Sequence, residues 1–157
     1  MKLLSEATEY GLRSVVWLAQ CPNEPQKVKD IAVEIRAAPG YLVNVLQDLA
    51  KAGILSARRG SKGGFTLLSD PAKLTALDVI NAIDPWERVH SCPLDKASHS
   101  RGLCPIHRQI DEAMASIEDM FQQLTILDVV NNETLIGEHC GNLPSVCASQ
   151  IVSCEAP

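Results

Sequence analysis

The feature that most limits the fold of this chain is the order of sequence patterns between residues 28 and 68. Apolar residues recur at helical spacing in two short runs, Val28, Ile31, Ala32 and Ile35, and then Leu42, Val45, Leu46 and Leu49. The tight connection RAAPGY separates the runs, and its Pro39 suits the first turn of a helix. After Gly53, which suits a left-handed helix cap, ILSARRGSKGGFTLL predicts two strands around a glycine-rich turn. The order predicts a mainly α chain with one small β-hairpin.

Capping patterns predict two further helices. Ser5 can cap a helix that carries Glu9 in its opening turn, where negative charge suits the helix dipole. Thr75 and Asp78 form a T-x-x-D capping box, and Pro85 ends the helix that follows it. These helices flank the first pattern on both sides.

A long helix is predicted from Pro105 to about residue 130. Its apolar residues alternate at steps of four and three, which is a heptad-like seam: Ile106, Ile110, Ala113, Ile117, Met120, Leu124 and Leu127. Such a helix is longer than a chain of this size needs internally, so we expect it to pack against its twin in a homodimer. Burial across its own domain is the alternative.

Charge is unevenly distributed along the chain. The net charge is -5, but residues 1–70 hold nine Lys and Arg against seven Asp and Glu, whereas residues 71–157 hold five against twelve. Between residues 49 and 69 there are four basic residues and no acidic one. A concentration of this kind meets phosphates, although a solvated surface run is the plain alternative.

Two short helices joined by a tight turn and followed by a basic hairpin predict a winged helix-turn-helix, with double-stranded DNA as the partner. Asn44 and Gln47 are the candidate base readers, because amides can pair bidentately with adenine. The full candidate DNA-binding set is Tyr41, Asn44, Gln47, Lys51, Arg58, Arg59, Ser61 and Lys62. Ordinary exposed amides are the alternative for Asn44 and Gln47.

The stretch HSCPLDKASHSRGLCPIH, residues 90–107, concentrates metal-ligand residue types. Cys92, His99, Cys104 and His107 offer two thiolates and two imidazoles, a set compatible with a Rieske-like 2Fe-2S centre or with tetrahedral zinc. Residue types alone do not separate these two, and a loop with redox-active thiols and no metal is a third reading.

The remaining composition bounds the class of protein. With 46% apolar residues in 157, the chain can bury one ordinary core, and its lack of an apolar run of membrane-spanning length leads us to expect a soluble, cytoplasmic protein that is not bound to a membrane. No Walker A, G-x-S-x-G or H-E-x-x-H motif occurs, so we expect no enzyme activity. An accessory protein that carries a cluster without binding DNA is a second class.

The segments SEATEYGLRSVVWLA, PGYLVNVLQDLAKAGIL, RRGSKGGFTLL and LTALDVINAI, followed by cysteines just before a long helix, resemble the Rrf2 (Rrf-two) family of regulators. That family includes the iron-sulfur cluster regulator, the nitric-oxide-sensitive repressor and an iron-responsive repressor. The resemblance implies a homodimeric winged helix-turn-helix transcription factor, usually a repressor. It would bind a pseudo-palindromic operator with an affinity set by an iron-sulfur cluster that responds to redox state, nitric oxide or iron.

The family pattern implies three cysteines in the loop, and this chain departs from it. The outer two are Cys92 and Cys104, but Ser98 occupies the middle position. The resemblance implies His107 as a further ligand, with His99 as the replacement for the missing thiolate. It also implies that Glu9 is a carboxylate supplied by the partner subunit. A 2Fe-2S cluster is favoured, and zinc or no metal is the alternative.

The expected organisation has four parts, and cysteines recur in the last. We expect a DNA-binding domain over 1–84 and a cluster or metal-binding loop over 85–104. A dimerisation helix over 105–130 and a cysteine-containing flexible tail over 131–157 complete the chain. The tail contains Cys140, Cys147 and Cys154, which we interpret as thiols of an irregular segment.

Overall fold

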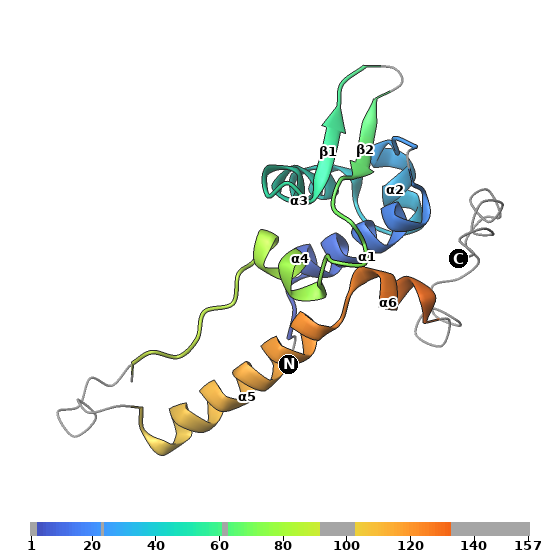
Figure 1. The fold of residues 1–157 in the computed structure, drawn as a ribbon. Helices are drawn as coiled ribbons and strands as arrows, with labels where there is room; N and C mark the ends of the chain where they lie inside the picture. The colour runs from blue at the N-terminus through green and yellow to red at the C-terminus, as the bar shows by residue number, and fades with distance from the viewer. Residues whose placement is uncertain (1–2, 23, 61–62, 92–102, 133–157) are drawn as a thin grey trace, which may run out of the picture.

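The computed structural model describes residues 3–22, 24–60, 63–91 and 103–132 (Figure 1). Across these ranges the elements are α1 (Glu6–Gln20), α2 (Val28–Glu34), α3 (Pro39–Lys51), β1 (Leu55–Arg58), β2 (Gly64–Leu67), α4 (Ala76–Ile83), α5 (Pro105–Gln123) and α6 (Ile126–Asn131). The predicted fold class, mainly α with a hairpin wing, is confirmed. Four predicted site residues lie outside the described residues: Ser61, Lys62, Cys92 and His99. Ser98, Cys140, Cys147 and Cys154 also lie outside them.

One apolar core joins α1 to α4, the hairpin and α6. Its members include Leu18, Ile31, Leu46 and Val79, each with no exposed surface, and Ile126 of α6, which is equally buried; α6 lies below α1 in the view of Figure 1. Burying an aliphatic side chain of this size contributes roughly 1.5–3 kcal/mol. The core therefore stabilises the part of the molecule that presents α3 and the hairpin.

The local signals read from the sequence act where they were expected. The Ser5 side chain accepts a hydrogen bond from the Thr8 N–H at 3.2 Å and caps α1. Pro39 occupies the first turn of α3, and Gly53, just beyond this helix, has a left-handed φ of 77°. Thr75 and Asp78 form the predicted capping box of α4. Each signal depends only on neighbouring residues.

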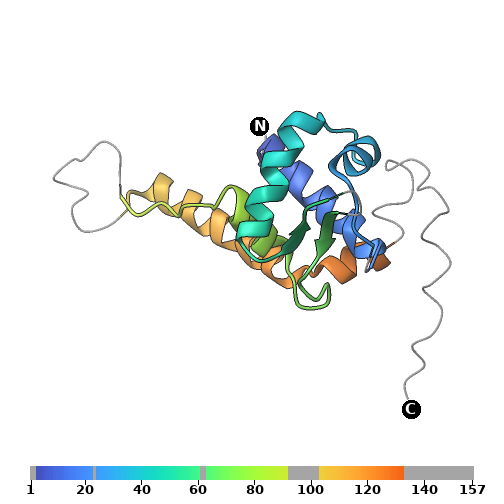
Figure 2. The same ribbon diagram turned by 90° about the horizontal axis from the view of Figure 1, so that it is seen from above.

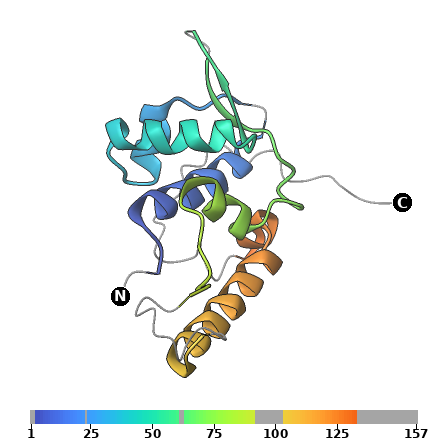
Figure 3. The same ribbon diagram turned by 90° about the vertical axis from the view of Figure 1, so that its left-hand side faces the viewer.

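The hairpin is attached to the body through the segment before α2. Strands β1 and β2 pair antiparallel, with Leu55 opposite Leu67 and Arg58 opposite Gly64. Gln26 and Phe65 also exchange two backbone hydrogen bonds, of 2.9 and 2.8 Å. Phe65 lies opposite Ala57, one pair from the turn, so β2 is held along its outer part, and the end of the hairpin projects beyond the helices (Figures 1 and 3).

The single long helix predicted over residues 105–130 is two helices. α5 ends at Gln123, Leu124 takes an extended conformation, and Thr125 caps α6 through a second capping box with Asp128. A Thr side chain that bonds the N–H three residues ahead starts a new helix and competes with continuation of the old one. Leu124 and Leu127 therefore do not extend the apolar seam of α5.

α5 extends away from the rest of the molecule. Figures 1 and 2 show its first turns far from α1 to α3, with only its last turns near α4 and α6. None of its residues is buried. Its 19 residues span about 28 Å at the usual rise per residue.

Candidate nucleic-acid interface and metal-ligand site

The outward face of α3 presents the predicted base readers. Leu42, Leu46 and Leu49 point into the core, so the helical period directs Asn44 and Gln47 to solvent, and both are exposed. α2 and α3 are joined by the short turn that contains Arg36, whose φ of 55° is left-handed. This arrangement leaves the polar face of α3 accessible to a partner with a groove that can receive a helix.

Tyr41, also in the predicted set, is held by a second aromatic ring. Its ring meets that of Tyr10 edge to face, with centroids 6.0 Å apart. The Tyr10 hydroxyl donates to Glu6 at 2.8 Å, and this hydrogen bond is the main cause of the raised pKa of Tyr10. Tyr41 thus lies at the start of α3 in an orientation set by α1.

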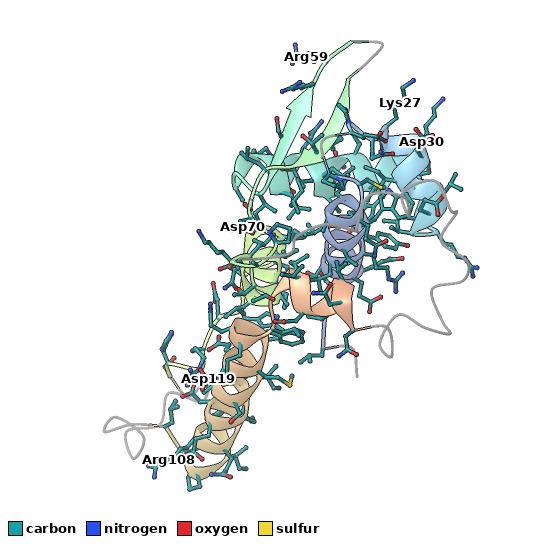
Figure 4. All side chains as sticks on the ribbon, turned by 45° about the vertical axis from the view of Figure 1, so that its right-hand side comes forward. Lys27, Asp30, Arg59, Asp70, Arg108 and Asp119 are labelled. Carbon is teal, nitrogen blue, oxygen red and sulfur yellow. The ribbon has the colours of Figure 1, made fainter. Side chains whose placement is uncertain are left out.

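The basic residues differ in how free they are. The Lys51 ammonium lies 2.7 Å from the Asp48 carboxylate, but the Lys51 side chain is 75% exposed, and such a pair is worth little in water. Arg58 and Arg59 are exposed and have no ion-pair partner in the described part of the chain. Figure 4 shows Arg59 near the free end of the hairpin. The hairpin arginines are available to an anionic partner.

The hairpin and α3 lie at the same end of the molecule, opposite the free end of α5, as Figure 3 shows. The predicted DNA-binding residues that the structure describes, Tyr41, Asn44, Gln47, Lys51, Arg58 and Arg59, are therefore presented by two neighbouring elements. They are all at least partly accessible. The structure therefore places the candidate DNA-binding residues of α3 and of the hairpin at one end of the molecule.

Two of the predicted metal ligands are side by side at the start of α5. Cys104 is the N-cap residue of α5, and its Sγ lies 3.2 Å from Nδ1 of His107 in the first turn. Spacing of three residues places both side chains on one face of a helix. A thiolate here would lie at the positive end of the helix dipole. The pair can supply one sulfur and one nitrogen ligand.

The described residues do not complete a metal site. No group of three or more His, Cys, Asp and Glu side chains is close enough to hold a metal within the described ranges. Glu9, the expected ligand from a partner subunit, is paired in this chain with Arg13 at 3.2 Å. The remaining donors predicted from the loop, Cys92 and His99, lie outside the described residues.

One charged residue within 85–104, Arg88, forms a group with α5 that the sequence does not predict. The guanidinium of Arg88 makes two hydrogen bonds of 2.7 Å to the two carboxylate oxygens of Asp111 and one of 3.3 Å to Glu118. The hydrogen bond to Arg88 is the main cause of the lowered pKa of Asp111, and the same bond raises the pKa of Arg88. No local pattern links residues so far apart, so only the fold could reveal this group.

The fold and the exposed face of α3 define the class of protein: a winged helix-turn-helix. The chain also belongs to a family, Rrf2, because the model of that family, described as an iron-dependent transcriptional regulator, matches residues 4–132. The resemblance seen in the sequence is therefore confirmed.

Curated relatives agree with this assignment. The chain is 28% identical over 134 residues to a helix-turn-helix-type transcriptional regulator of Aquifex aeolicus, covering 83% of this chain and 93% of the relative. It is also 28% identical over 139 residues to the transcriptional regulator NsrR of Shouchella clausii, covering 83% and 89%. These relatives are transcriptional regulators and not enzymes, so this chain is a DNA-binding transcriptional regulator.

Solved structures share the fold. CymR of B. subtilis, the global cysteine regulator, is 27% identical with a TM-score of 0.64, covering 83% of this chain and 97% of CymR. IscR of T. potens has a TM-score of 0.67 at 24% identity, covering 83% and 86%, which supports the fold alone. Among the described residues, no helix is both long and apolar enough to cross a membrane.

Proposed function

We propose that this protein is a homodimeric repressor that binds a pseudo-palindromic operator, with operator affinity set by a 2Fe-2S cluster at the start of α5. The observation that carries the DNA-binding part is the placement of the exposed amides of α3 at the same end of the molecule as Arg58 and Arg59, which have no ion-pair partner among the described residues. Sequence reading and backbone tracking require these two kinds of contact at one surface.

In this proposal α3 lies in the major groove. Asn44 and Gln47 read base edges, while Tyr41 and Lys51 contact the backbone at the two ends of the helix. Arg58 and Arg59, with Ser61 and Lys62 at the turn, follow the phosphates or the minor groove. The phosphate contacts set affinity and the amide contacts set sequence preference.

The dimer forms through α5. Its apolar residues Ile106 and Met120 are 71% and 56% exposed, and Ile110 between them is 44% exposed. A second copy of α5 would remove this apolar face from water, and a two-fold dimer would place two α3 helices on half-sites about one helical turn apart. Residues 1–84 then act as the DNA-binding domain, 85–104 as the ligand loop and 131–157 as a tail.

The cofactor would be held by Cys104 and His107 together with Cys92, with His99 as fourth ligand from the same loop or Glu9 from the partner subunit. The thiol and imidazole at the start of α5 fit one half of such a donor set, because they lie 3.2 Å apart on one helix face. The family model is described as iron-dependent, which favours iron over zinc. When bound, a cluster would make the site sensitive to redox state, nitric oxide or iron supply.

A thiol-based regulator without a metal is the second candidate. It is favoured by the similarity to CymR, which is described as a global cysteine regulator. Cys104 is partly exposed and has His107 as its neighbour, an arrangement in which a thiol can also react directly.

Salt-dependent DNA binding tests the first part of the proposal. The affinity of the whole chain for a duplex that carries the promoter of its own gene is measured against salt concentration. Replacing Arg58 and Arg59 by Gln should weaken binding and lower the salt slope by about two. Arg108→Gln, on the far end of α5 as Figure 4 shows, is the control and should leave both unchanged. Binding that is insensitive to salt and to both hairpin arginines would contradict the proposal.

Absorption spectra with iron and sulfide assays test the second part. Protein purified without oxygen should be coloured and contain iron and sulfide, and Cys92→Ala and Cys104→Ala should each remove the colour. Cys147→Ala, in the tail, is the control and should keep it. Colourless protein that contains zinc or no metal would support the second candidate instead.

A further inference from the structure

The segments that lead into α4 and α6 are nearly the same over eight residues. LTALDVIN at 74–81 and LTILDVVN at 124–131 share six of eight positions, and each contains a complete capping box. The two segments face each other across an antiparallel bridge between Thr75 and Thr125. The Ala76 N–H donates to the Leu124 carbonyl, and the Ile126 N–H donates to the Leu74 carbonyl, both at 2.9 Å. The end of α5 is thereby fixed to the beginning of α4.

A second attachment joins α5 to the segment that follows the C-terminal end of α4. The segment after α4 runs along α5, with the Trp86 ring against the Phe121 ring at 5.7 Å between centroids. Arg88 then binds Asp111 through both oxygens and reaches Glu118, two helical turns away on the same face. Both ends of α4 are thus tied to α5.

The Arg88 attachment differs from the other ion pairs of the described chain. Among the described residues, its two pairs are the only ones that join different elements, since the remaining three link residues three or four apart. The Arg88, Asp111 and Glu118 side chains are 33%, 23% and 22% exposed. Partly shielded, bidentate pairs are the kind that fix geometry.

α4 is in turn tightly packed on the DNA-binding body. It contacts α1 and α3, and a Cβ placed on Gly11 of α1 would lie 2.1 Å from the Ile83 side chain of α4. A change in the position of α5 that moves α4 must therefore also move α1 and α3, because close-packed interiors transmit displacement.

We propose that Arg88 is a positioning residue: through Asp111 and Glu118 it holds α5, whose N-cap and first turn carry Cys104 and His107, in a fixed placement relative to α4 and α3. This inference rests on the proposed function, because the consequence of the attachment is the placement of two α3 helices on DNA. Arg88 follows α4 in the chain and binds two carboxylates of α5, and the proposal gives it no contact with DNA.

The test compares Arg88→Gln with Arg108→Gln in the whole chain. Arg108 is exposed, lies on α5 and has no ion pair in the described part of the chain, so it controls for the loss of one charge. Arg88→Gln should weaken binding to the promoter duplex about fivefold or more, while the salt slope stays at the wild-type value. Arg88→Lys keeps the charge without the two-pronged geometry and should recover only part of the affinity.

Fluorescence of Trp86 reports the attachment independently of DNA. A Trp17→Phe background leaves Trp86 as the single tryptophan, and Trp17 Nε1 has no hydrogen-bond partner among the described residues. Arg88→Gln should shift the Trp86 emission to the red as the ring leaves Phe121, and Arg108→Gln should not. Asp111→Asn should give the same shift, and the double variant should add little to it.

The outcomes separate the inference from the function on which it rests. Weakened binding with an unchanged slope and a shifted emission supports the positioning role. If Arg88→Gln lowers the melting temperature but binds DNA with wild-type affinity at temperatures well below melting, Arg88 has only a structural role and the inference is wrong. Unchanged Trp86 emission would overturn the attachment alone, and absence of DNA binding by the wild-type chain would overturn the proposed function.

Discussion

α3 and α5 begin alike and end in opposite environments. Each has Pro in its first turn and lacks a side-chain cap, and each carries apolar residues at helical spacing. α3 buries Leu42, Val45, Leu46 and Leu49, whereas α5 buries none of its residues. The difference teaches that helical periodicity predicts an apolar face but does not determine what covers it.

The two regions therefore have different sources of stability. The body around α3 is held by its own core, since most of its apolar side chains are in contact with one another. α5 is attached through Arg88, Trp86 and the Thr75–Thr125 bridge, and its outer apolar face is open to a partner. Substitutions on the two helices should accordingly affect different measurements.

The largest effect should come from the core. Leu46→Ala removes a fully buried side chain and should lower the free energy of unfolding by about 2–5 kcal/mol. Ile106→Ala, on the free face of α5, should change the unfolding of the dissociated chain by less than about 0.5 kcal/mol. Urea unfolding at low protein concentration measures both. Equal losses for the two variants would erase the distinction between the regions.

The next effect should appear only in association. Ile110→Asp places a charge in the apolar face of α5 and should weaken dimerisation by roughly 30–100-fold, about 2–3 kcal/mol, because the charge must lose water on association. Sedimentation velocity over a concentration series measures this. Gln122→Asp, on the opposite face of α5, is the matched control. A wild-type chain that is monomeric at every concentration would contradict the role given to α5.

A smaller gain is expected in the turn before α3. Arg36 has a φ of 55°, a conformation that costs a residue with a Cβ about 1–2 kcal/mol and glycine far less. Arg36→Gly should therefore raise the free energy of unfolding by up to about 1 kcal/mol without altering dimerisation. Arg36→Ala keeps the strain and should give no gain. Chemical denaturation of both variants checks this, and a gain for Ala as well would point to charge instead.

The smallest effect should appear at the attachment between the regions, as a dependence on pH. Arg88 holds the pKa of Asp111 below its ordinary value of 3.8, with help from the Val89 N–H and from His90. The contribution of this carboxylate is therefore complete above about pH 4 and is lost as pH falls through the lowered pKa. The free energy of unfolding should be higher for wild type than for Asp111→Asn near neutral pH, and the two values should converge in acid. A constant difference would contradict this.

Much of the fold followed from local chemistry. Ser5, Pro39, Gly53 and the Thr75–Asp78 box were predicted because each acts on neighbours within a few residues. The prediction of one helix over 105–130 is wrong for an equally local reason: Thr125 and Asp128 form the same T-x-x-D capping box, which begins a new helix. The apolar periodicity continues to Leu127, but the capping box at Thr125 separates α5 from α6.

The candidate site divides along the same line. The outward placement of Asn44 and Gln47 and the basic hairpin were predicted and are confirmed as exposed features. The ligand assignments stay predictions, because only Cys104 and His107 of the loop set are described, together with Glu9. The Arg88 attachment could not be predicted, because charge pairs between distant segments follow no sequence period.

The sequence by itself determined where helices begin, which faces are apolar and which residues face solvent beside them, because capping and periodicity act over a few residues. The tertiary structure alone decided that α3 and the hairpin share one end of the molecule. It also decided that α4 is tied to α5 at both ends and that α5 leaves its apolar face uncovered. Those outcomes depend on packing between segments far apart in the chain, where many pairings are compatible with the same local pattern.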